Sequence, residues 1–340
     1  MKVYSRIWCL VFIVMLGCNK KEQPDPVLAS GEWKNGLLVL HEGLFQQNNS
    51  KLSWLNLSDF SFYADLFSAK NNRYLGDTAN DMAIYGGKIY IVVNASSTVE
   101  VLDKHSMQSV AQIPMQFNGQ AQQPRKIAFH QNKAFVSSFD GYVNVIDTAS
   151  LSIKQRIKVG RNPEGLAVHE DKLYVANSGG LDFPNYDSTV FCIDLNLMQV
   201  TDTIFVGANP GNVLALPHAG IFVVKRGNYG NDPSELIWIN PTNHTIESAL
   251  QDISGIGLSS RDNELFVWHF NHGTQQSVVH LFNPYSRQIE HANFITSADV
   301  KTLYGVFPMD SERFAVCDAQ QFVNLGKLLI FNYQGQKLST

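Results

Sequence analysis

Lys172-Leu173-Tyr174-Val175-Ala176 and, after a polar loop, Val190-Phe191-Cys192-Ile193-Asp194 form the stretch of the chain that is most informative about its fold. Both runs are short and rich in β-branched and aromatic residues, which is typical of β-strands. The first run recurs as an apolar strand that starts at residues 37, 88, 133, 172, 220, 264 and 313, about 46 residues apart. A period of that length indicates an array of repeated structural units.

Each copy of the repeat contains further strands. The second run recurs after every copy of the first and usually ends in Asp or Asn, side chains that favour turns by bonding nearby backbone. Another strand with alternating polarity follows in most copies, as in residues 153–159. No helical period of useful length appears. Seven units of about four antiparallel strands predict an all-β fold, a seven-bladed β-propeller whose blades stack around a central channel.

The first copy differs from the others because it lacks an inner strand before Leu37. Either residues 27–33 or the C-terminal strand would complete this blade and close the ring. The sequence leaves both alternatives open.

The composition agrees with one large folded body. Of the 340 residues, 44% are hydrophobic and 16% are charged, and the formal net charge is −4. This much apolar material excludes global disorder, and the absence of a basic excess argues against nucleic acid as a partner. Length alone suggests two domains, but the repeat assigns residues 34–340 to a single propeller.

The N-terminal segment resembles a bacterial lipoprotein signal. An apolar run over residues 7–16 follows two basic residues, and it is too short to span a bilayer as a helix. It ends in Met15-Leu16-Gly17-Cys18, which resembles a lipobox. We therefore expect a signal peptide over residues 1–17, lipidation of Cys18, and a flexible tether over residues 18–33. A plain signal peptide with an incidental cysteine is the alternative.

Two further cysteines lie in apolar, strand-like runs. Cys192 and Cys317 are expected to be separate buried thiols, although the sequence does not exclude a bridge between them.

The repeat resembles a known propeller family. Its clearest copy is similar to the YncE-like repeat over Asn162-Pro163-Glu164-Gly165-Leu166-Ala167-Val168, residues 172–179 and residues 189–194. Residues 36–53, 72–82 and 227–230 are similar to lipid-anchored surface-layer propellers, and the resemblance spans roughly residues 31–335. In that subgroup, BtuG-type lipoproteins hold cobalamin at the cell surface and cap an outer-membrane transporter. The resemblance implies a ligand-capturing protein.

In a propeller, the loops that join the second and third strands share one face with the links between blades. Here these segments are long, over residues 41–51, 177–188, 225–235, 269–277 and 318–326, and over 67–80 and 117–124 between blades. Because long loops cost entropy to order and often carry function, we expect this face to bind a ligand or partner. Its candidate contact residues are Tyr74, Arg125, Phe139, Phe183, Tyr186, Tyr229, Phe270, His272 and Phe322.

A second set of candidates begins the inner strands and is expected around the channel mouth. Its members are Asn80, Asp81, Arg125, Glu164 and Asn212. The simpler alternatives are that these polar groups only solvate a water-filled channel, and that the loop aromatics only pack their own loops.

Motifs for catalysis and metal binding are weak. His269 and His272, with His280 downstream, have no Cys or carboxylate partner near in sequence, so no metal site is expected. Hydrolytic propellers use an axial metal held by acids, but Arg125 interrupts the acids available here, which disfavours a cation. No cofactor is expected, apart from cobalamin as a bound ligand.

The sequence therefore predicts a lipid-anchored binding protein of the outer membrane that faces the cell exterior and is not an enzyme. The resemblance implies that it captures a small nutrient, cobalamin or another corrinoid, and docks on a TonB-dependent transporter. The alternatives are a structural or adhesive propeller that contacts protein or glycan and, less favoured, a lactonase or quinoprotein-like enzyme.

Overall fold

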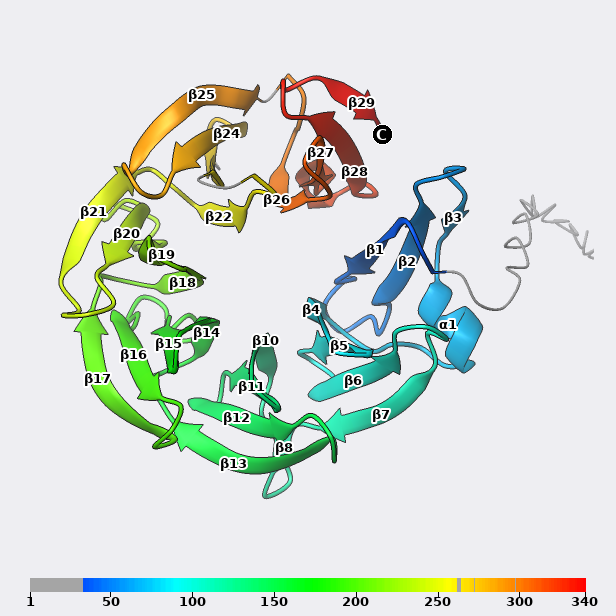
Figure 1. Ribbon diagram of the computed structural model, residues 1–340, viewed down its shortest axis with the longest axis horizontal. Coiled ribbons are helices and arrows are strands. Elements are labelled where there is room, and N and C mark those ends of the chain that lie inside the picture. The colour runs from blue at the N-terminus through cyan, green and yellow to red at the C-terminus, as the bar shows by residue number, and fades with distance from the viewer. Residues whose placement is uncertain (1–32, 262–263, 272, 297) are drawn as a thin grey trace, which may run out of the picture.

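The computed structural model describes residues 33–261, 264–271, 273–296 and 298–340, which form a ring of seven antiparallel sheets (Figure 1). The structure thus confirms the predicted seven-bladed β-propeller. The signal peptide, Cys18 and residues 18–32 of the expected tether lie outside the described residues. Within those ranges, no helix has the length and apolar character needed to cross a membrane.

The blades follow one another along the chain, and in each blade the strands are ordered from the channel outward. Blade 1 has three strands, and blades 2 to 7 have four. Their bounds are, for blade 1, β1 (Gly36–His41), β2 (Lys51–Asn56) and β3 (Phe62–Tyr63); for blade 2, β4 (Ala79–Tyr85), β5 (Lys88–Val93), β6 (Thr98–Asp103) and β7 (Ser109–Pro114); for blade 3, β10 (Pro124–His130), β11 (Lys133–Ser138), β12 (Tyr142–Asp147) and β13 (Ser152–Lys158); for blade 4, β14 (Pro163–His169), β15 (Lys172–Asn177), β16 (Thr189–Asp194) and β17 (Gln199–Phe205); for blade 5, β18 (Pro210–Leu216), β19 (Gly220–Lys225), β20 (Glu235–Ile239) and β21 (Ile246–Gln251); for blade 6, β22 (Gly255–Leu258), β23 (Leu265–Asn271), β24 (Gln276–Asn283) and β25 (Gln288–Thr296); and for blade 7, β26 (Leu303–Pro308), β27 (Arg313–Asp318), β28 (Lys327–Asn332) and β29 (Lys337–Ser339).

The apolar strand that marks the repeat is the second strand of each complete blade. In blade 4, Tyr174 of β15 pairs with Ala167 of β14 and with Cys192 of β16. Leu173, Tyr174 and Val175 have no exposed surface, because neighbouring blades cover both faces of the sheet. A strand buried on both faces needs a continuous apolar run, which explains why this strand gave the strongest sequence signal.

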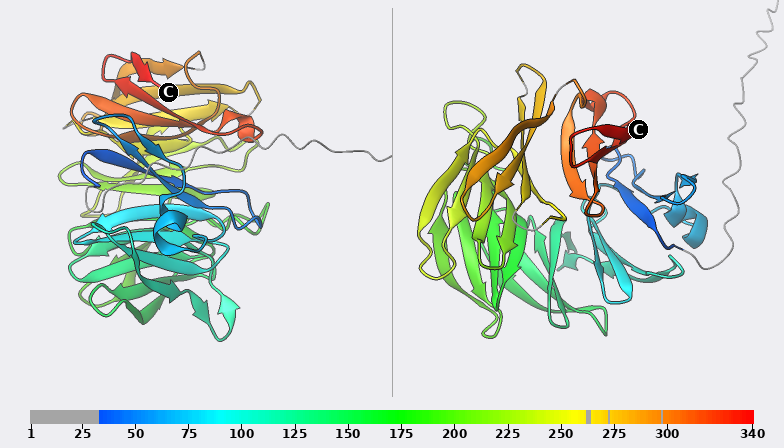
Figure 2. Two further views of the ribbon diagram at one scale, coloured as in Figure 1. Left: turned by 90° about the vertical axis from the view of Figure 1, so that its right-hand side faces the viewer. Right: turned by 45° about the horizontal axis from the view of Figure 1, so that its top comes forward.

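Six hydrophobic clusters hold the ring together, and each fills the seam between two consecutive blades. Among the described residues, no such cluster joins blade 7 to blade 1, although Figures 1 and 2 show these two blades, in red and blue, beside each other. β1 is the innermost strand of blade 1, and its apolar residues Leu37 and Val39 are only half-buried. The seam between the first and last blades is therefore the least packed part of the ring.

The C-terminal strand does not complete blade 1. β29 pairs with β28 as the outermost strand of blade 7, so that alternative is wrong. Of the other alternative, residues 27–33, only Trp33 is described, and it packs on Trp54 and Tyr63 of blade 1.

Because the seam beside blade 1 is poorly packed, a Val→Ala substitution is expected to cost less stability in blade 1 than in blade 4. Val175→Ala removes buried methyl groups between packed blades and is expected to lower the free energy of unfolding by about 2 kcal/mol. Val39→Ala is expected to cost less than about 1 kcal/mol, because Val39 is only half-buried. Urea denaturation of both variants measures the difference, and equal losses would show that the first blade is packed as tightly as the fourth.

Two connections differ from the sequence prediction. The predicted loop over residues 269–277 is wrong, because β23 continues to Asn271 and β24 begins at Gln276. The link over residues 67–80 includes most of a short helix, α1 (Leu66–Asn71), whose N-terminus is capped by the Asp65 carboxylate accepting a bond from Ser68 N at 3.1 Å. Six residues are too few to show a helical period, so this helix is not predictable from the hydrophobic pattern.

The two cysteines of the described region are free thiols in different blades, Cys192 in β16 and Cys317 in β27. Burial raises the pKa of the Cys192 thiol and raises that of Cys317 to about 11. Both therefore stay protonated and unreactive near neutral pH.

Candidate functional site

The loops are longer on one face of the ring than on the other. Segments 178–188, 226–234 and 319–326 join second to third strands on one face, and segment 42–50, between β1 and β2 of blade 1, lies on the same face. First and second strands of the complete blades are joined on the other face by short turns such as 86–87 and 170–171. We call the first of these the long-loop face. The links between blades lie on it as well, as does the short hairpin of β8 (Gln116–Phe117) and β9 (Gln120–Ala121).

At the mouth of the channel on this face, four of the predicted residues meet. Nε and Nη2 of Arg125 donate to the Glu164 carboxylate at 3.2 Å. The Arg125 guanidinium also lies 4.6 Å from the centre of the Phe139 ring. When the side-chain amide of Asn80 is oriented so that both its oxygen and its nitrogen have partners, the oxygen accepts a hydrogen bond from Nη1 of Arg125. Neighbouring blades thus place a cation, a buried carboxylate, an amide and an aromatic ring at one point.

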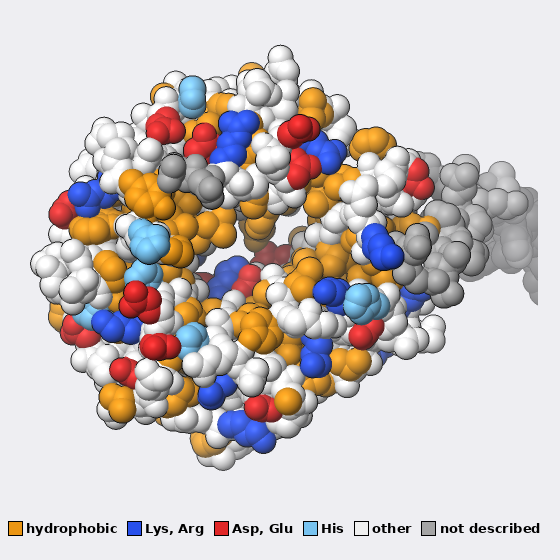
Figure 3. Space-filling model, viewed as in Figure 1, with side chains coloured by type: hydrophobic (Ala, Val, Ile, Leu, Met, Phe, Trp, Pro, Cys, Tyr) orange, Lys and Arg blue, Asp and Glu red, His pale blue; other side chains and the backbone are white. Residues whose placement is uncertain are grey.

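Three further residues, which are not among the predicted contact residues, join this group. Nη1 of Arg226 lies 3.8 Å from the Glu164 carboxylate. The Tyr304 hydroxyl donates to the carboxylate of Glu42 and so links blade 7 to blade 1. Burial and the Glu42 charge raise the pKa of Tyr304, so it stays protonated near neutral pH. The ring in Figure 3 is hollowed at its centre, and charged side chains of both signs lie along the opening.

The other two residues predicted at the channel mouth have structural contacts. The Asp81 carboxylate accepts a bond from Ile127 N at 2.8 Å and lies 3.6 Å from Lys126 Nζ, so it ties β4 to β10. Asn212 is half-buried in β18. At this point β18 lies close to β14, because a Cβ added to Gly165 would be 3.1 Å from the Cα of Asn212. Asp81 thus holds two inner strands together, and Asn212 lies where two inner strands approach closely.

Three of the predicted aromatic residues form one cluster on the long-loop face. The rings of Phe183 and Tyr186 are 6.0 Å apart and those of Tyr186 and Tyr229 are 6.2 Å apart, both edge to face. Phe183 is 71% exposed and Tyr229 is 68% exposed. We call this group the aromatic trio; it joins the long loops of blades 4 and 5.

The remaining predicted aromatics are dispersed. Tyr74 follows α1 and is exposed, whereas Phe270 lies in β23. Phe322 belongs to the 3-10 turn η1 (Gln320–Phe322), and its exposed ring meets Tyr304 at 6.1 Å. His272 lies outside the described residues. The structure therefore does not gather Tyr74, Phe270 and Phe322 around the aromatic trio.

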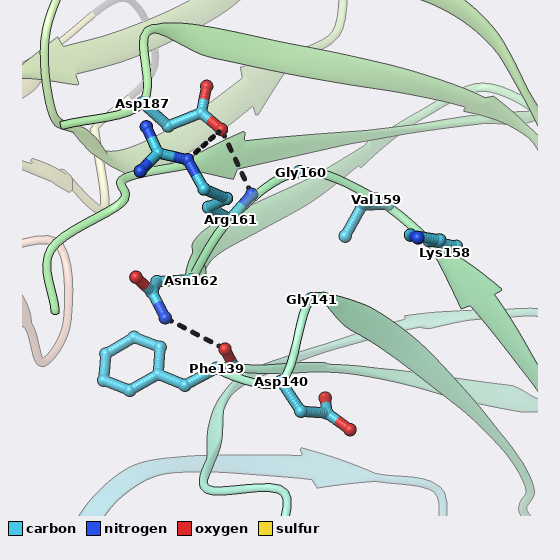
Figure 4. A pocket seen from close by; sticks show the side chains of 9 residues that line it. All are labelled: Phe139, Asp140, Gly141, Lys158, Val159, Gly160, Arg161, Asn162 and Asp187. Atoms are coloured by element: carbon cyan, nitrogen blue, oxygen red, sulfur yellow. Dashed lines mark hydrogen bonds and ion pairs between the residues drawn. The ribbon is translucent and has the colours of Figure 1, made fainter. Parts of the chain in front are cut away.

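A pocket of roughly 350 Å³ opens between blades 3 and 4, beside the channel mouth (Figure 4). Asn162 Nδ2 donates to the Phe139 carbonyl at 2.9 Å, and the Arg161 backbone N–H donates to Asp187 at 3.1 Å. Burial raises the pKa of Asp140, although Gln122 and Arg156 act in the opposite direction. Of the lining residues, only Phe139 is among the predicted contact residues; the equivalent Gly-x-Asn-Pro turns at 160–163 and 207–210 are the sequence feature that marks the others.

The described part of the chain contains no group of three or more His, Cys, Asp or Glu side chains placed to hold a metal ion. His269 and His280 lie on neighbouring strands and line a second pocket of about 200 Å³. Burial and the neighbouring His269 lower the pKa of His280.

These features define a seven-bladed β-propeller that presents loops, aromatic rings and an ion-pair network at one end of its channel. The chain belongs to the family described as "Domain of unknown function (DUF5074)", whose model matches residues 35–247. No functionally curated protein matches the chain.

Solved structures share the fold at low sequence identity. A chain of the Kuenenia stuttgartiensis hydrazine synthase has a TM-score of 0.62 and 13% identity, covering 82% of this chain and 88% of that chain. The computationally designed protein Ika8 has a TM-score of 0.53 and 10% identity, with coverages of 84% and 79%. BamB from Moraxella catarrhalis has a TM-score of 0.51 and 16% identity, with coverages of 85% and 78%. At these identities the likeness concerns the propeller fold alone.

Proposed function

We propose that the protein is a lipid-anchored surface propeller that binds a corrinoid, such as cobalamin, on its long-loop face. It would be held on the outer membrane through Cys18, face the cell exterior and pass its ligand to a TonB-dependent transporter. Its role would be binding, without catalysis. The lipobox-like Met15-Leu16-Gly17-Cys18 motif supports the anchor, and the resemblance to BtuG-type lipoproteins supports the ligand class.

One observation carries the proposal of a binding face: large apolar side chains stand exposed on the long-loop face. Apart from the trio, the loops of blades 1, 4 and 7 expose Leu44, Phe45, Leu181, Val323 and Leu325. Exposed apolar groups that lie close together on a protein surface mark a site of association. Aromatic rings provide a large contact area at a low cost in conformational entropy, which suits a broad, partly apolar ligand.

The test of this function is a direct binding measurement. Calorimetric titration of the purified protein with cyanocobalamin, and then with other corrinoids, is expected to show saturable binding. Absence of detectable affinity for every corrinoid would contradict the proposed ligand.

Substitution of the aromatic trio locates the binding. Replacing Phe183 and Tyr229 with Ala is expected to weaken cobalamin binding about 10-fold or more, because exposed aromatic anchors contribute about 1–2 kcal/mol each at binding surfaces. Shortening residues 181–187 should have a similar effect. The matched control is Leu197→Ala with Tyr285→Ala, two exposed apolar residues in turns on the opposite face. Equal affinities of the trio variant and the control would contradict this location.

The second candidate function is a structural or adhesive propeller. Val323 and Leu325 are 77% and 92% exposed beside Phe322, and a projecting apolar loop of this kind suits contact with a macromolecule. This function predicts that no small nutrient stabilises the protein in a thermal-shift screen.

A further inference from the structure

Arg226 is the first residue after β19, and its position is determined by close contacts. Its backbone N–H donates to the Asn209 carbonyl at 3.0 Å, which fixes the start of the loop. The guanidinium lies directly against Gly211, where an added Cβ would be 2.6 Å from Cζ and 2.7 Å from Nε of Arg226. The absence of a side chain at position 211 therefore makes room for the guanidinium at the channel mouth.

Among the residues that the structure describes, none accepts a hydrogen bond from the Arg226 side chain. A guanidinium offers five N–H donors, yet the nearest carboxylate oxygen, on Glu164, is 3.8 Å from Nη1, which is longer than a hydrogen bond. That carboxylate already accepts three bonds from Arg125. The guanidinium groups of Arg125 and Arg226 thus share the Glu164 carboxylate. Among the described residues, Glu164 is the one ion-pair partner of the Arg226 side chain.

The loop that follows Arg226 is braced and bears an aromatic ring. Lys225 precedes the loop, and its Nζ lies 2.8 Å from Asp232 and 3.2 Å from Glu235, both near the other end of the loop. Burial acts to lower the pKa of Lys225, but these two carboxylates outweigh it and raise the pKa, so the brace stays charged. Tyr229 of this loop belongs to the aromatic trio. A cation with free donors and an exposed aromatic surface are therefore held on one ordered segment.

We propose that Arg226 binds an oxyanion, a carboxylate or phosphate group, of the ligand that the long-loop face receives. A guanidinium pairs with either group through two parallel N–H bonds, and Glu164 is too far away to compete for them. The aromatic trio would cover an apolar part of the same ligand. This assignment deepens the proposed function and rests on it only for the identity of the face.

The experiment uses small oxyanions as probes. Titration of the protein with inorganic pyrophosphate and with citrate, at constant ionic strength, is expected to show weak saturable binding of at least one. Arg226→Ala should weaken that binding at least 10-fold, and Arg226→Lys should restore it only in part, because lysine lacks the planar fork. Gly211→Ala should also weaken it by displacing the guanidinium. Arg287→Ala is the matched control: its side chain is 32% exposed against 30% for Arg226, and it lies in the β24–β25 turn on the opposite face.

The possible failures are distinguishable. If neither probe binds, or if Arg226→Ala binds both as tightly as the unchanged protein, the assignment of Arg226 is wrong, whatever the outcome with cobalamin. If an oxyanion binds through Arg226 while every corrinoid fails, the assignment stands and the proposed ligand falls.

Discussion

Arg125→Ala is expected to lower the free energy of unfolding by about 3 kcal/mol. The substitution removes the partner of the Glu164 carboxylate, whose side chain is only 7% exposed, and a buried charge without its partner typically costs 3–5 kcal/mol. We place the effect at the lower end because Arg226 remains 3.8 Å from that carboxylate. The measurement is urea denaturation followed by circular dichroism.

Glu164→Gln in the Arg125→Ala background provides the decisive comparison. If the cost comes from the unpaired charge, neutralising that charge should recover a large part of the lost stability, so the double variant is more stable than Arg125→Ala alone. The control is Arg161→Ala, whose partner Asp182 is 55% exposed; an exposed pair contributes about 0–1 kcal/mol. A double variant no more stable than Arg125→Ala would show that lost packing on Phe139, and not charge, causes the loss.

Most of the fold was predictable because every complete blade imposes the same physical demand. Its second strand is covered on both faces, so it must be apolar throughout, and this requirement recurs with each blade. Local pairing is less visible in the chain. Residues 269–277 look like a loop in the sequence, yet β23 and β24 extend into this segment and Asn271 pairs with Gln276. Closure of the ring depends on contacts between the chain ends, which no local pattern reports.

The site was predictable where the repeat places equivalent residues together. Asn80, Arg125 and Glu164 each lie near the start of an inner strand, so the symmetry of the ring brings them to one end of the channel. Arg226 was missed because it follows a second strand. Glu42 and Phe139 occupy the same place in their blades, directly after β1 and β11. The residue that directly follows the marker strand in each copy of the repeat was therefore the sequence feature that could have identified Arg226.

Phe135→Ala is expected to have the largest effect on stability of any substitution considered for this protein. The ring of Phe135 has no exposed surface and belongs to the cluster between blades 3 and 4. Its position in the second strand carries a fully buried ring in four other blades as well: Tyr90, Tyr174, Phe222 and Phe266. Truncating such a ring removes its burial and leaves a cavity that closely packed blades cannot fill.

Urea denaturation is therefore expected to show a loss of about 4 kcal/mol for Phe135→Ala, within the range typical of buried aromatic truncations. Phe135→Leu, which keeps most of the volume, should lose much less and keeps the comparison possible if the alanine variant does not fold. Phe205→Ala is the control, because Phe205 is 68% exposed on β17 and its truncation should change stability by less than about 0.5 kcal/mol. A loss below about 1 kcal/mol for Phe135→Ala would contradict the role of these rings as the packing between blades, since it would mean that the seam collapses around the cavity.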